Sequence, residues 1–193
     1  MSSWRPALAV TALIALALVA AQAITLFIFG QPPICTCGVV KLWEPGVLSS
    51  GNSQHLSDWY SFSHIVHGFI FYGLLALLMP RVPVRLRLLM ALGVEIAWEI
   101  TENTPMVIQH YREQALAQGY TGDSIINSVS DSIMMVIGFV FAWRFPWRAT
   151  LALAIVLELF ALYMIRDNLT LNVIGLIHPV QAISDWQAAG GIK

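Results

Sequence analysis

Residues 93–103, GVEIAWEITEN, place three carboxylates in a stretch that otherwise has the composition of a membrane helix. Glu95, Glu99 and Glu102 follow one another at intervals of four and three residues, which puts them on one face of an α-helix. An ionisable side chain costs at least about 2.5–3.5 kcal/mol at the bilayer centre, so it usually faces protein or water. The stretch therefore predicts a helix inside a bundle, with polar partners on neighbouring helices.

The composition of the whole chain is that of a membrane protein. Of its 193 residues, 58% are hydrophobic and 11% are charged, and the mean hydropathy is +0.71. Soluble domains carry about 25% charged residues. The arginines are scattered and form no basic stripe, so nothing in the sequence indicates a nucleic-acid partner.

Five apolar stretches are long enough, or nearly so, for a hydrocarbon core that needs roughly 20 helical residues. We expect an all-α integral membrane bundle, a single domain over residues 1–193, with five transmembrane helices at residues 6–29, 59–79, 86–102, 125–145 and 149–165. The segments outside the membrane would be the outer loops 30–58 and 103–124 and the outer tail 166–193. The tail predicts a short helix in the membrane interface, broken at Pro179, or alternatively a sixth buried or re-entrant element.

The first stretch allows a second interpretation. Ala21-Gln22-Ala23 after an apolar run resembles a signal-peptide cleavage site, and cleavage would leave four spans. The apolar run continues through Phe29, and only Arg5 precedes it, which favours a retained spanning helix.

The charges between the stretches predict the orientation. Arginines without any acid precede the first stretch and separate the second from the third and the fourth from the fifth: Arg5, Arg81, Arg85, Arg87, Arg144 and Arg148. Most acids lie on the opposite side, together with Lys41, Arg112, Arg166 and Lys193. Because positive residues collect on the cytoplasmic side, we expect the N-terminus inside and the C-terminus outside.

Polar stripes on two other helices supply partners for the carboxylates. His64 and His67 lie three residues apart near the start of the second stretch, and the fourth begins with the stripe Ser124, Asn127, Ser128 and Asp131. With the expected orientation, all three stripes fall in the outer half of the membrane. The inner halves, residues 70–79 and 133–142, contain Tyr72 but no ionisable acid or base, which disfavours a through-channel.

These side chains allow several kinds of chemistry. His64, His67 and Glu99 could ligate a divalent metal ion, although their spacing matches no established metal motif. Glu95 and Glu99 could act as a general acid or proton relay with His64, or the whole set could be a structural hydrogen-bond network.

Other acids and the cysteines admit more than one role. Asp123 and Asp131 raise the possibility of an aspartyl dyad, but Asp123 is better placed to cap the helix that follows it. Cys35 and Cys37 could form a disulfide, a redox pair or a metal clasp, or simply pack a loop. Glu158 has no evident partner.

Several strings of the sequence resemble a known family. ICTCGVVKLW (34–43), NSQHLSDWYSFSHIVHG (52–68), EIAWEITENTP (95–105), YTGDSIINSVSD (120–131) and IRDNLTLN (165–172) are similar to an uncharacterised family of small multi-pass bacterial inner-membrane proteins. The resemblance implies the bacterial inner membrane, with a cytoplasmic N-terminus and a periplasmic C-terminus on the charge argument, and supplies no activity.

A more distant likeness is to the VanZ-like membrane proteins. The shared layout is a histidine near one helix start, a glutamate on the next helix, and a basic residue before an Asp/Asn helix start. Here these would be His64 or His67, Glu95 or Glu99, Arg112, and Asp123 with Asn127.

Three functions fit these features. The first is an enzyme acting at the outer leaflet on a lipid or polyprenyl-linked phosphate: Arg112 and Arg166 would hold the phosphate, with Asp123 and Asn127 beside it. His64, Glu99 and Glu95 would perform acid–base work or bind a metal, and Asp131 would orient these groups or act as a ligand. The second is a non-catalytic ion- or lipid-binding or transport protein, and the third is a structural subunit of a membrane complex.

Overall fold

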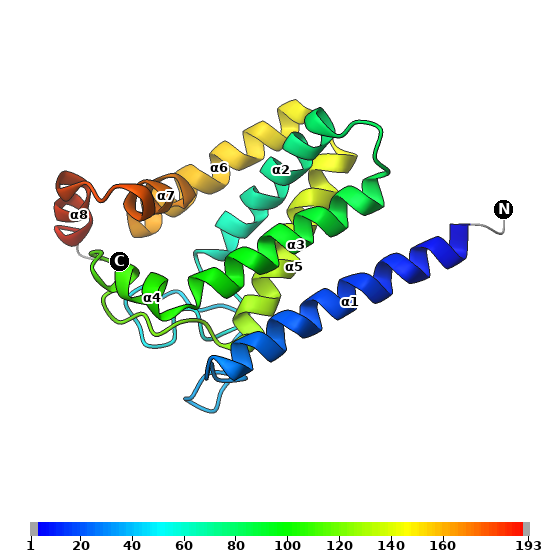
Figure 1. Cartoon of the computed structure of the whole chain (residues 1–193). Coiled ribbons are helices and arrows are strands. Elements are labelled where there is room, and N and C mark those ends of the chain that lie inside the picture. The colour runs from blue at the N-terminus through cyan, green and yellow to red at the C-terminus, as the bar shows by residue number, and fades with distance from the viewer. Residues whose placement is uncertain (1–3, 191–193) are drawn as a thin grey trace.

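The computed structural model describes residues 4–190, with side chains from residue 7 onward, so the Arg5 side chain and Lys193 lie outside the described residues. The described chain is all-α, as expected (Figure 1). Its helices are α1 (Trp4–Ile28), α2 (Ser61–Leu78), α3 (Val84–Glu102), α4 (Pro105–Arg112), α5 (Ile125–Arg144), α6 (Trp147–Ile165), α7 (Leu169–Ile177) and α8 (Gln181–Ala188).

Four of the described helices, α1, α2, α5 and α6, are long and apolar enough to cross a membrane. This supports a membrane location. α3 has 19 residues, a comparable length, but it carries two arginines and three glutamates and is less apolar than the other four. Length and composition therefore make these four helices candidate membrane spans, and a fifth crossing by α3 stays a prediction.

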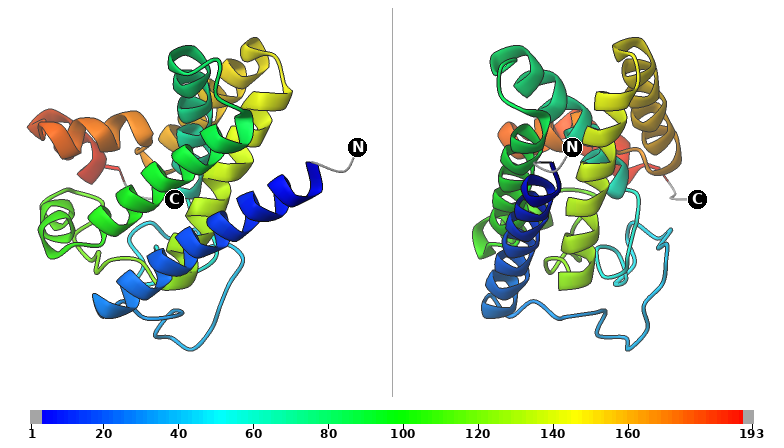
Figure 2. Two further views of the ribbon diagram at one scale, coloured as in Figure 1. Left: turned by 45° about the vertical axis from the view of Figure 1, so that its right-hand side comes forward. Right: turned by 90° about the vertical axis from the view of Figure 1, so that its right-hand side faces the viewer.

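α2 and α5 form the centre of the bundle, and α3 packs against both of them (Figure 2). The backbones of α2 and α5 approach closely at Gly68 of α2 and Gly138 of α5, where a side chain would collide with the facing main chain. Met135 and Phe139 of α5 are buried there beside Ile96 of α3. α1 lies along α3 and α5, and its remaining surface is exposed apolar side chains.

Short turns at one end of the bundle connect α2 to α3 and α5 to α6 (Figure 1). Pro83 and Pro146 stand directly before α3 and α6, because proline cannot continue a helix but suits its start. Arginines lie in or directly beside each turn, and the guanidinium of Arg144 lies over the Trp143 ring, 4.3 Å from its centre. The N-terminal end of α1 lies at this same end.

The opposite end of the bundle holds the long loop before α2, the short helix α4 and the tail helices α7 and α8 (Figure 1). The loop is fastened to the start of α5: Ser124 N donates to Ser53 O at 2.9 Å, and Ile125 N donates to Pro32 O at 2.9 Å. Within the loop, Cys35 and Cys37 form a disulfide, one of the alternatives considered above.

The tail and the segment before α5 contain structure that the sequence did not fully indicate. α4 was expected to be loop, and it begins at Pro105 in the first helical turn. The tail forms two short helices that break around Pro179, and neither is long enough to be a sixth span. Glu158 does have a partner: its carboxylate accepts hydrogen bonds from Leu169 N, Thr170 N and Thr170 Oγ1 and so adds to the capping of α7 by Asn168.

Candidate functional site

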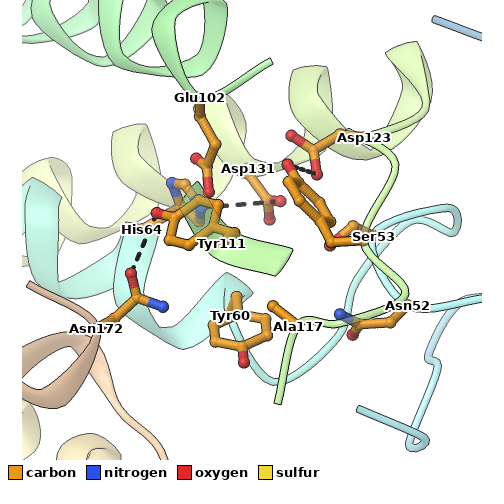
Figure 3. A pocket seen from close by; sticks show the side chains of 11 residues that line it. Asn52, Ser53, Tyr60, His64, Glu102, Tyr111, Ala117, Asp123, Asp131 and Asn172 are labelled. Carbon is orange, nitrogen blue, oxygen red and sulfur yellow. Dashed lines mark hydrogen bonds and ion pairs between the residues drawn. The ribbon is translucent and has the colours of Figure 1, made fainter. Parts of the chain in front are cut away.

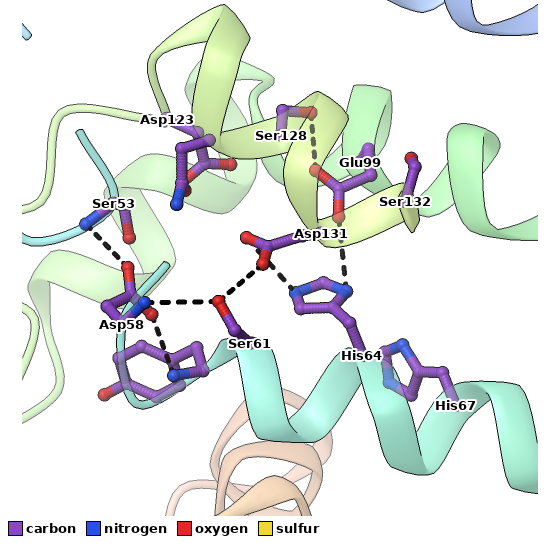
Figure 4. A network of polar contacts seen from close by, with 12 residues as sticks. Ser53, Asp58, Ser61, His64, His67, Glu99, Asp123, Ser128, Asp131 and Ser132 are labelled. Carbon is purple, nitrogen blue, oxygen red and sulfur yellow. Dashed lines mark hydrogen bonds and ion pairs between the residues drawn. The ribbon is translucent and has the colours of Figure 1, made fainter. Parts of the chain in front are cut away.

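His64 of α2 lies at the centre of a buried group of acids that comes from α3 and α5 (Figure 4). Its Nδ1 is 2.5 Å from Oε1 of Glu95 and 3.3 Å from Oε1 of Glu99, both on α3. Its Nε2, on the other side of the ring, is 3.9 Å from Oδ2 of Asp131 on α5. The structure thus brings together the four residues that the sequence singled out for chemistry.

His67 joins this group from the next turn of α2. Its Nδ1 is 3.1 Å from Oε2 of Glu95, and its ring stacks on Phe71. The carboxylate between the two histidines is therefore Glu95, whereas the sequence analysis had placed Glu99 there. We call His64, His67, Glu95, Glu99 and Asp131 the His64 cluster.

A series of hydrogen bonds from α5 and α1 holds one oxygen of the Glu99 carboxylate. Ser128 Oγ donates to Glu99 Oε2 at 2.6 Å, and Gln22 Nε2 of α1 donates to Ser128 Oγ at 2.7 Å. Ser132 Oγ in turn donates to Gln22 Oε1 at 3.0 Å. Glu99 Oε1 is fully buried and receives no hydrogen bond. Gln22 was missed as a site residue, because its place in Ala21-Gln22-Ala23 drew attention to cleavage.

A second series of hydrogen bonds orients Asp131 and connects it to Asp58, in the loop before α2. Ser61 Oγ donates to Asp131 Oδ1 at 2.7 Å, and the main-chain N–H of Asp58 donates to Ser61 Oγ at 3.2 Å. The Asp58 carboxylate accepts from the backbone of Ser53 and Tyr60. Burial raises the pKa of Asp58 above its usual value despite these hydrogen bonds.

Asp123 belongs to a neighbouring polar group and does not cap α5, contrary to expectation. The cap is Ser124, whose Oγ accepts from Asn127 N at 3.3 Å. Asp123 instead accepts from Asn103 Nδ2 at 2.6 Å and from the Tyr120 hydroxyl at 2.9 Å. Burial raises the pKa of Asp123 to about 6.

A polar cavity opens beside these groups (Figure 3). We call it the polar chamber, and it has a volume of about 40 Å³. Three acids, a histidine, three tyrosines, two asparagines and two small residues line it: Glu102, Asp123, Asp131, His64, Tyr60, Tyr111, Tyr120, Asn52, Asn172, Ser53 and Ala117. His64, Glu102 and Asp131 point into the same space (Figure 3).

A larger, mostly apolar cavity of about 340 Å³ adjoins the chamber between α2, α3 and α7. We call it the apolar groove. The residues that line only the groove are Ser63, His67, Phe71, Val94, Trp98, Leu169, Val173, Leu176 and Ile177. Five residues line both spaces: Tyr60, His64, Glu102, Tyr111 and Asn172. The chamber and the groove are therefore adjacent parts of one site.

The remaining residues predicted to bind substrate lie elsewhere. Arg112 Nε donates to Tyr120 O at 2.6 Å, and Arg166 donates to Trp186 O at 2.6 Å. Asn127 is buried and donates to His55 O at 2.8 Å. All three hold loops or the tail in place. Within the described residues, no lysine or arginine lines the chamber or the groove.

Sequence reasoning missed several residues of the cavity, and the reason differs among them. Glu102 was predicted to share a face with Glu95 and Glu99 but was not named as a site residue, and it lines both spaces. Tyr111 and Asn172 lie far apart in the sequence, and the Tyr111 hydroxyl donates to Asn172 Oδ1 at 3.2 Å. Only the folding of α7 back towards α4 brings them together, and no local pattern signals that.

The arrangement can move protons or hold a cation. His64 presents one ring nitrogen to Glu95 and the other to Asp131 at the chamber, the geometry in which a carboxylate fixes the imidazole tautomer. Ligand atoms of His64, His67 and Glu95 all lie within 4.8 Å of one another. Cys35, Cys37 and His55 are equally close, but both sulfurs are committed to the disulfide.

Comparison with known proteins identifies relatives over nearly the whole chain. A family described as "Protein of unknown function (DUF2585)" matches residues 26–189. A UPF0314 protein of Sphingopyxis alaskensis is 58% identical over 178 residues, covering 92% of this chain and 95% of that protein. UPF0314 proteins of Rhizobium etli and Brucella anthropi are 55% and 49% identical, over 91% and 92% of this chain and 89% and 90% of their own lengths.

No solved structure matches the chain. The more distant likeness to VanZ-like proteins is not supported by these matches, whereas the resemblance to an uncharacterised bacterial family is. On the extent and identity of these matches, the chain belongs to the DUF2585 family, whose relatives carry the name UPF0314.

Proposed function

We propose that this protein is an enzyme that acts on an amphipathic lipid of the outer leaflet of the bacterial inner membrane. The observation that supports this most is the shared wall between the polar chamber and the apolar groove. A molecule with a polar head and a hydrocarbon chain can fill both spaces at once. A water-soluble substrate would leave the groove without an apolar occupant, and a purely apolar one would leave the acids of the chamber unpaired.

The proposed orientation has five crossings, with α3 as the fifth. α3 follows α2 after a short turn, and at 1.5 Å per residue its 19 residues are about 28 Å long, close to the hydrocarbon thickness. Its acids face α2 and α5 and are thereby kept from lipid. The arginine-rich turns would then be cytoplasmic, and the chamber, α4, α7 and α8 periplasmic.

The proposed reactive centre is the His64 cluster. His64 and Asp131 face the chamber, and Glu95 and Glu99 support the imidazole from behind. A histidine between carboxylates is suited to take up and return a proton during a reaction. Because His64 also lines the groove, the reacting bond would lie near the junction of head and chain.

The chamber also restricts the headgroup. Its acids, amides and tyrosines favour a head rich in hydroxyl or amino donors. Arg112 and Arg166, expected to bind a phosphate, bind backbone carbonyls instead. A phosphate would therefore need a cation to bridge it to the carboxylates of the chamber.

Two valine-to-tryptophan variants, one inside the groove and one outside it, test whether a lipid occupies the groove. Val94 lines the groove and is 55% exposed, and Val156 of α6 does not line it and is 59% exposed. We expect Val94→Trp to fill the groove and Val156→Trp to leave it open. The assay is mass spectrometry of lipids that copurify with each protein after gentle detergent extraction. A lipid class retained by the parent and Val156→Trp but lost from Val94→Trp supports the proposal.

Turnover is tested with the same proteins and a total bacterial lipid extract. We expect one lipid class to be depleted and a new product to form with the parent and not with His64→Ala. Retention of a lipid without any product would indicate a lipid-binding protein. If Val94→Trp and Val156→Trp retain the same lipids, the two-part site is not a lipid site and the proposal is wrong.

A further inference from the structure

From the geometry of the His64 cluster we infer that it binds a divalent first-row transition-metal ion through His64 Nδ1, His67 Nδ1 and Glu95. This inference rests on the proposed function in one respect, since the ion would serve the reaction at the junction of chamber and groove. The binding itself is a separate property and is tested separately.

The positions of the ligand atoms fit such an ion closely. Ligand atoms about 2.1 Å from a tetrahedral ion stand about 3.4 Å apart. Glu95 Oε2 is 3.1 Å from His67 Nδ1, and Glu95 Oε1 is 3.4 Å from it. The ligand atoms of all three residues lie within 4.8 Å of one another, and the 2.5 Å contact between His64 Nδ1 and Glu95 Oε1 would have to open by about 1 Å. Both histidines already aim Nδ1 at the same carboxylate, as they would at a shared ion.

The charges of the cluster also call for a cation. Glu95, Glu99 and Asp131 are each at most 4% exposed, and only the two histidines lie within ion-pair distance of them among the described residues. Buried carboxylates are paired with a positive charge, coordinate a metal or take up a proton. The two imidazoles are neutral in their metal-binding form, so a divalent ion would supply positive charge beside these carboxylates.

Glu99 provides an independent sign that something is missing from the cluster. Its Oε1 is buried, receives no hydrogen bond and is aimed at His64 Nδ1, 3.3 Å away. Its other oxygen is held by Ser128 Oγ, so the carboxylate cannot simply turn to another partner. With an ion bound to His64, Glu99 Oε1 is placed to accept a hydrogen bond from a water molecule on that ion.

The surroundings match those of a reactive metal site better than those of a structural one. Three protein ligands leave a position open, as in catalytic zinc sites, and His64 and His67 both line the groove. On the opposite side of the His64 ring, Asp131 Oδ2 is 3.9 Å from Nε2, beyond hydrogen-bond distance but on the side where metal-bound histidines usually have a carboxylate partner. Mixed imidazole and carboxylate ligands suit Zn²⁺, Mn²⁺ or Fe²⁺.

The test measures metal binding directly, on full-length protein purified with a tag that contains no histidine. Metal content is determined by plasma mass spectrometry, and Zn²⁺, Mn²⁺ and Fe²⁺ are then titrated against a competing chelator. The ligand variants are His67→Ala and Glu95→Gln. Their matched controls are His178→Ala and Glu113→Gln, both at exposed positions outside the cavity. Elution profile and helical content establish that each variant is folded.

We expect the parent and both controls to bind one ion per chain, and both ligand variants to bind it at least about 100-fold more weakly. Asp131→Asn, which removes only the charge beside Nε2, should weaken binding by about 10–100-fold. Equal binding by parent and ligand variants, or no binding by a folded parent in any titration, would overturn the inference. The lipid proposal is judged by the groove variants alone, so either idea can fail while the other stands.

Discussion

Gly68 is the position at which we expect the smallest substitution to have the largest effect. A Cβ atom at this residue would lie 2.1 Å from the carbonyl oxygen of Met135 and 2.5 Å from the amide nitrogen of Phe139. Both atoms belong to the main chain of α5, which cannot turn aside as a flexible side chain can. Ordinary contact begins at 3.4 Å, so Gly68→Ala must separate the two helices locally by about 3.4 − 2.1 = 1.3 Å.

The separation has an energetic and a functional consequence. Overfilling a packed interface costs about 1–3 kcal/mol, and we expect the free energy of unfolding to fall by that amount. His64 lies one helical turn before Gly68, so its 3.9 Å approach to Asp131 would lengthen, by up to about 1.3 Å, as α2 and α5 separate. Gly68→Ala should therefore also reduce activity, or metal binding, at the His64 cluster.

Gly73 provides the matched control, because it lies on the same helix and a Cβ there meets nothing within 4 Å. Gly73→Ala should be neutral or stabilising by about 0.5–1 kcal/mol, since alanine favours a helix over glycine. Both variants are compared with the parent by reversible unfolding in detergent micelles. If Gly68→Ala is as stable as Gly73→Ala, the close approach of α2 and α5 is wrong.

Three further predictions concern the tail, the pH dependence and the orientation. Glu158→Ala removes three hydrogen bonds to the start of α7 and leaves the N-cap Asn168 in place; it should cost about 1–2 kcal/mol and accelerate hydrogen exchange over residues 169–177, whereas Glu113→Ala, at an exposed site, should do neither. Burial raises the pKa of Asp167, which follows α6, to about 6 from 3.8. The folded state therefore holds this proton more tightly, and the parent should lose up to about 3 kcal/mol of stability as pH rises from 4 to 6; Asp167→Asn should lack this part of the slope. For the orientation, a membrane-impermeant maleimide should label Glu113→Cys in intact spheroplasts and Arg81→Cys only after permeabilisation; labelling of both without permeabilisation would contradict the five-span arrangement.

The all-α bundle could be predicted from the sequence because lipid leaves few alternatives to apolar helices. The polar stripes of α2, α3 and α5 were equally readable, since helical spacing fixes which residues share a face. That is why His64, Glu95, Glu99 and Asp131 were predicted to meet. The choice of Glu95 over Glu99 as the carboxylate between the histidines depends on helix rotation, which spacing alone does not set.

The parts that could not be predicted depend on contacts between segments distant in the sequence. Arg112 and Arg166 were assigned to a phosphate because a guanidinium near a polar site is suited to one. In the structure each finds a backbone carbonyl within its own loop or tail. The groove exists only because α7 folds back beside α2 and α3, and its short apolar sequence does not specify where it will pack.

A comparison of Glu158 with Glu99 separates structural from functional acids in this protein. Both are single carboxylates on long helices, and each is held by hydrogen bonds. Both oxygens of Glu158 are used by the start of α7, so capping accounts for the whole side chain. Glu99 uses only one oxygen for structure, and the other is buried towards His64 without a hydrogen bond.

A serine or glutamine at position 99 could make the hydrogen bond to Ser128 without burying a charge, and the unsatisfied oxygen of Glu99 costs about 1–3 kcal/mol or more. If Glu99 is purely structural, Glu99→Gln should stabilise the fold and leave metal binding and turnover unchanged; if the His64 cluster is a reactive site, the same variant should keep or gain stability and lose turnover.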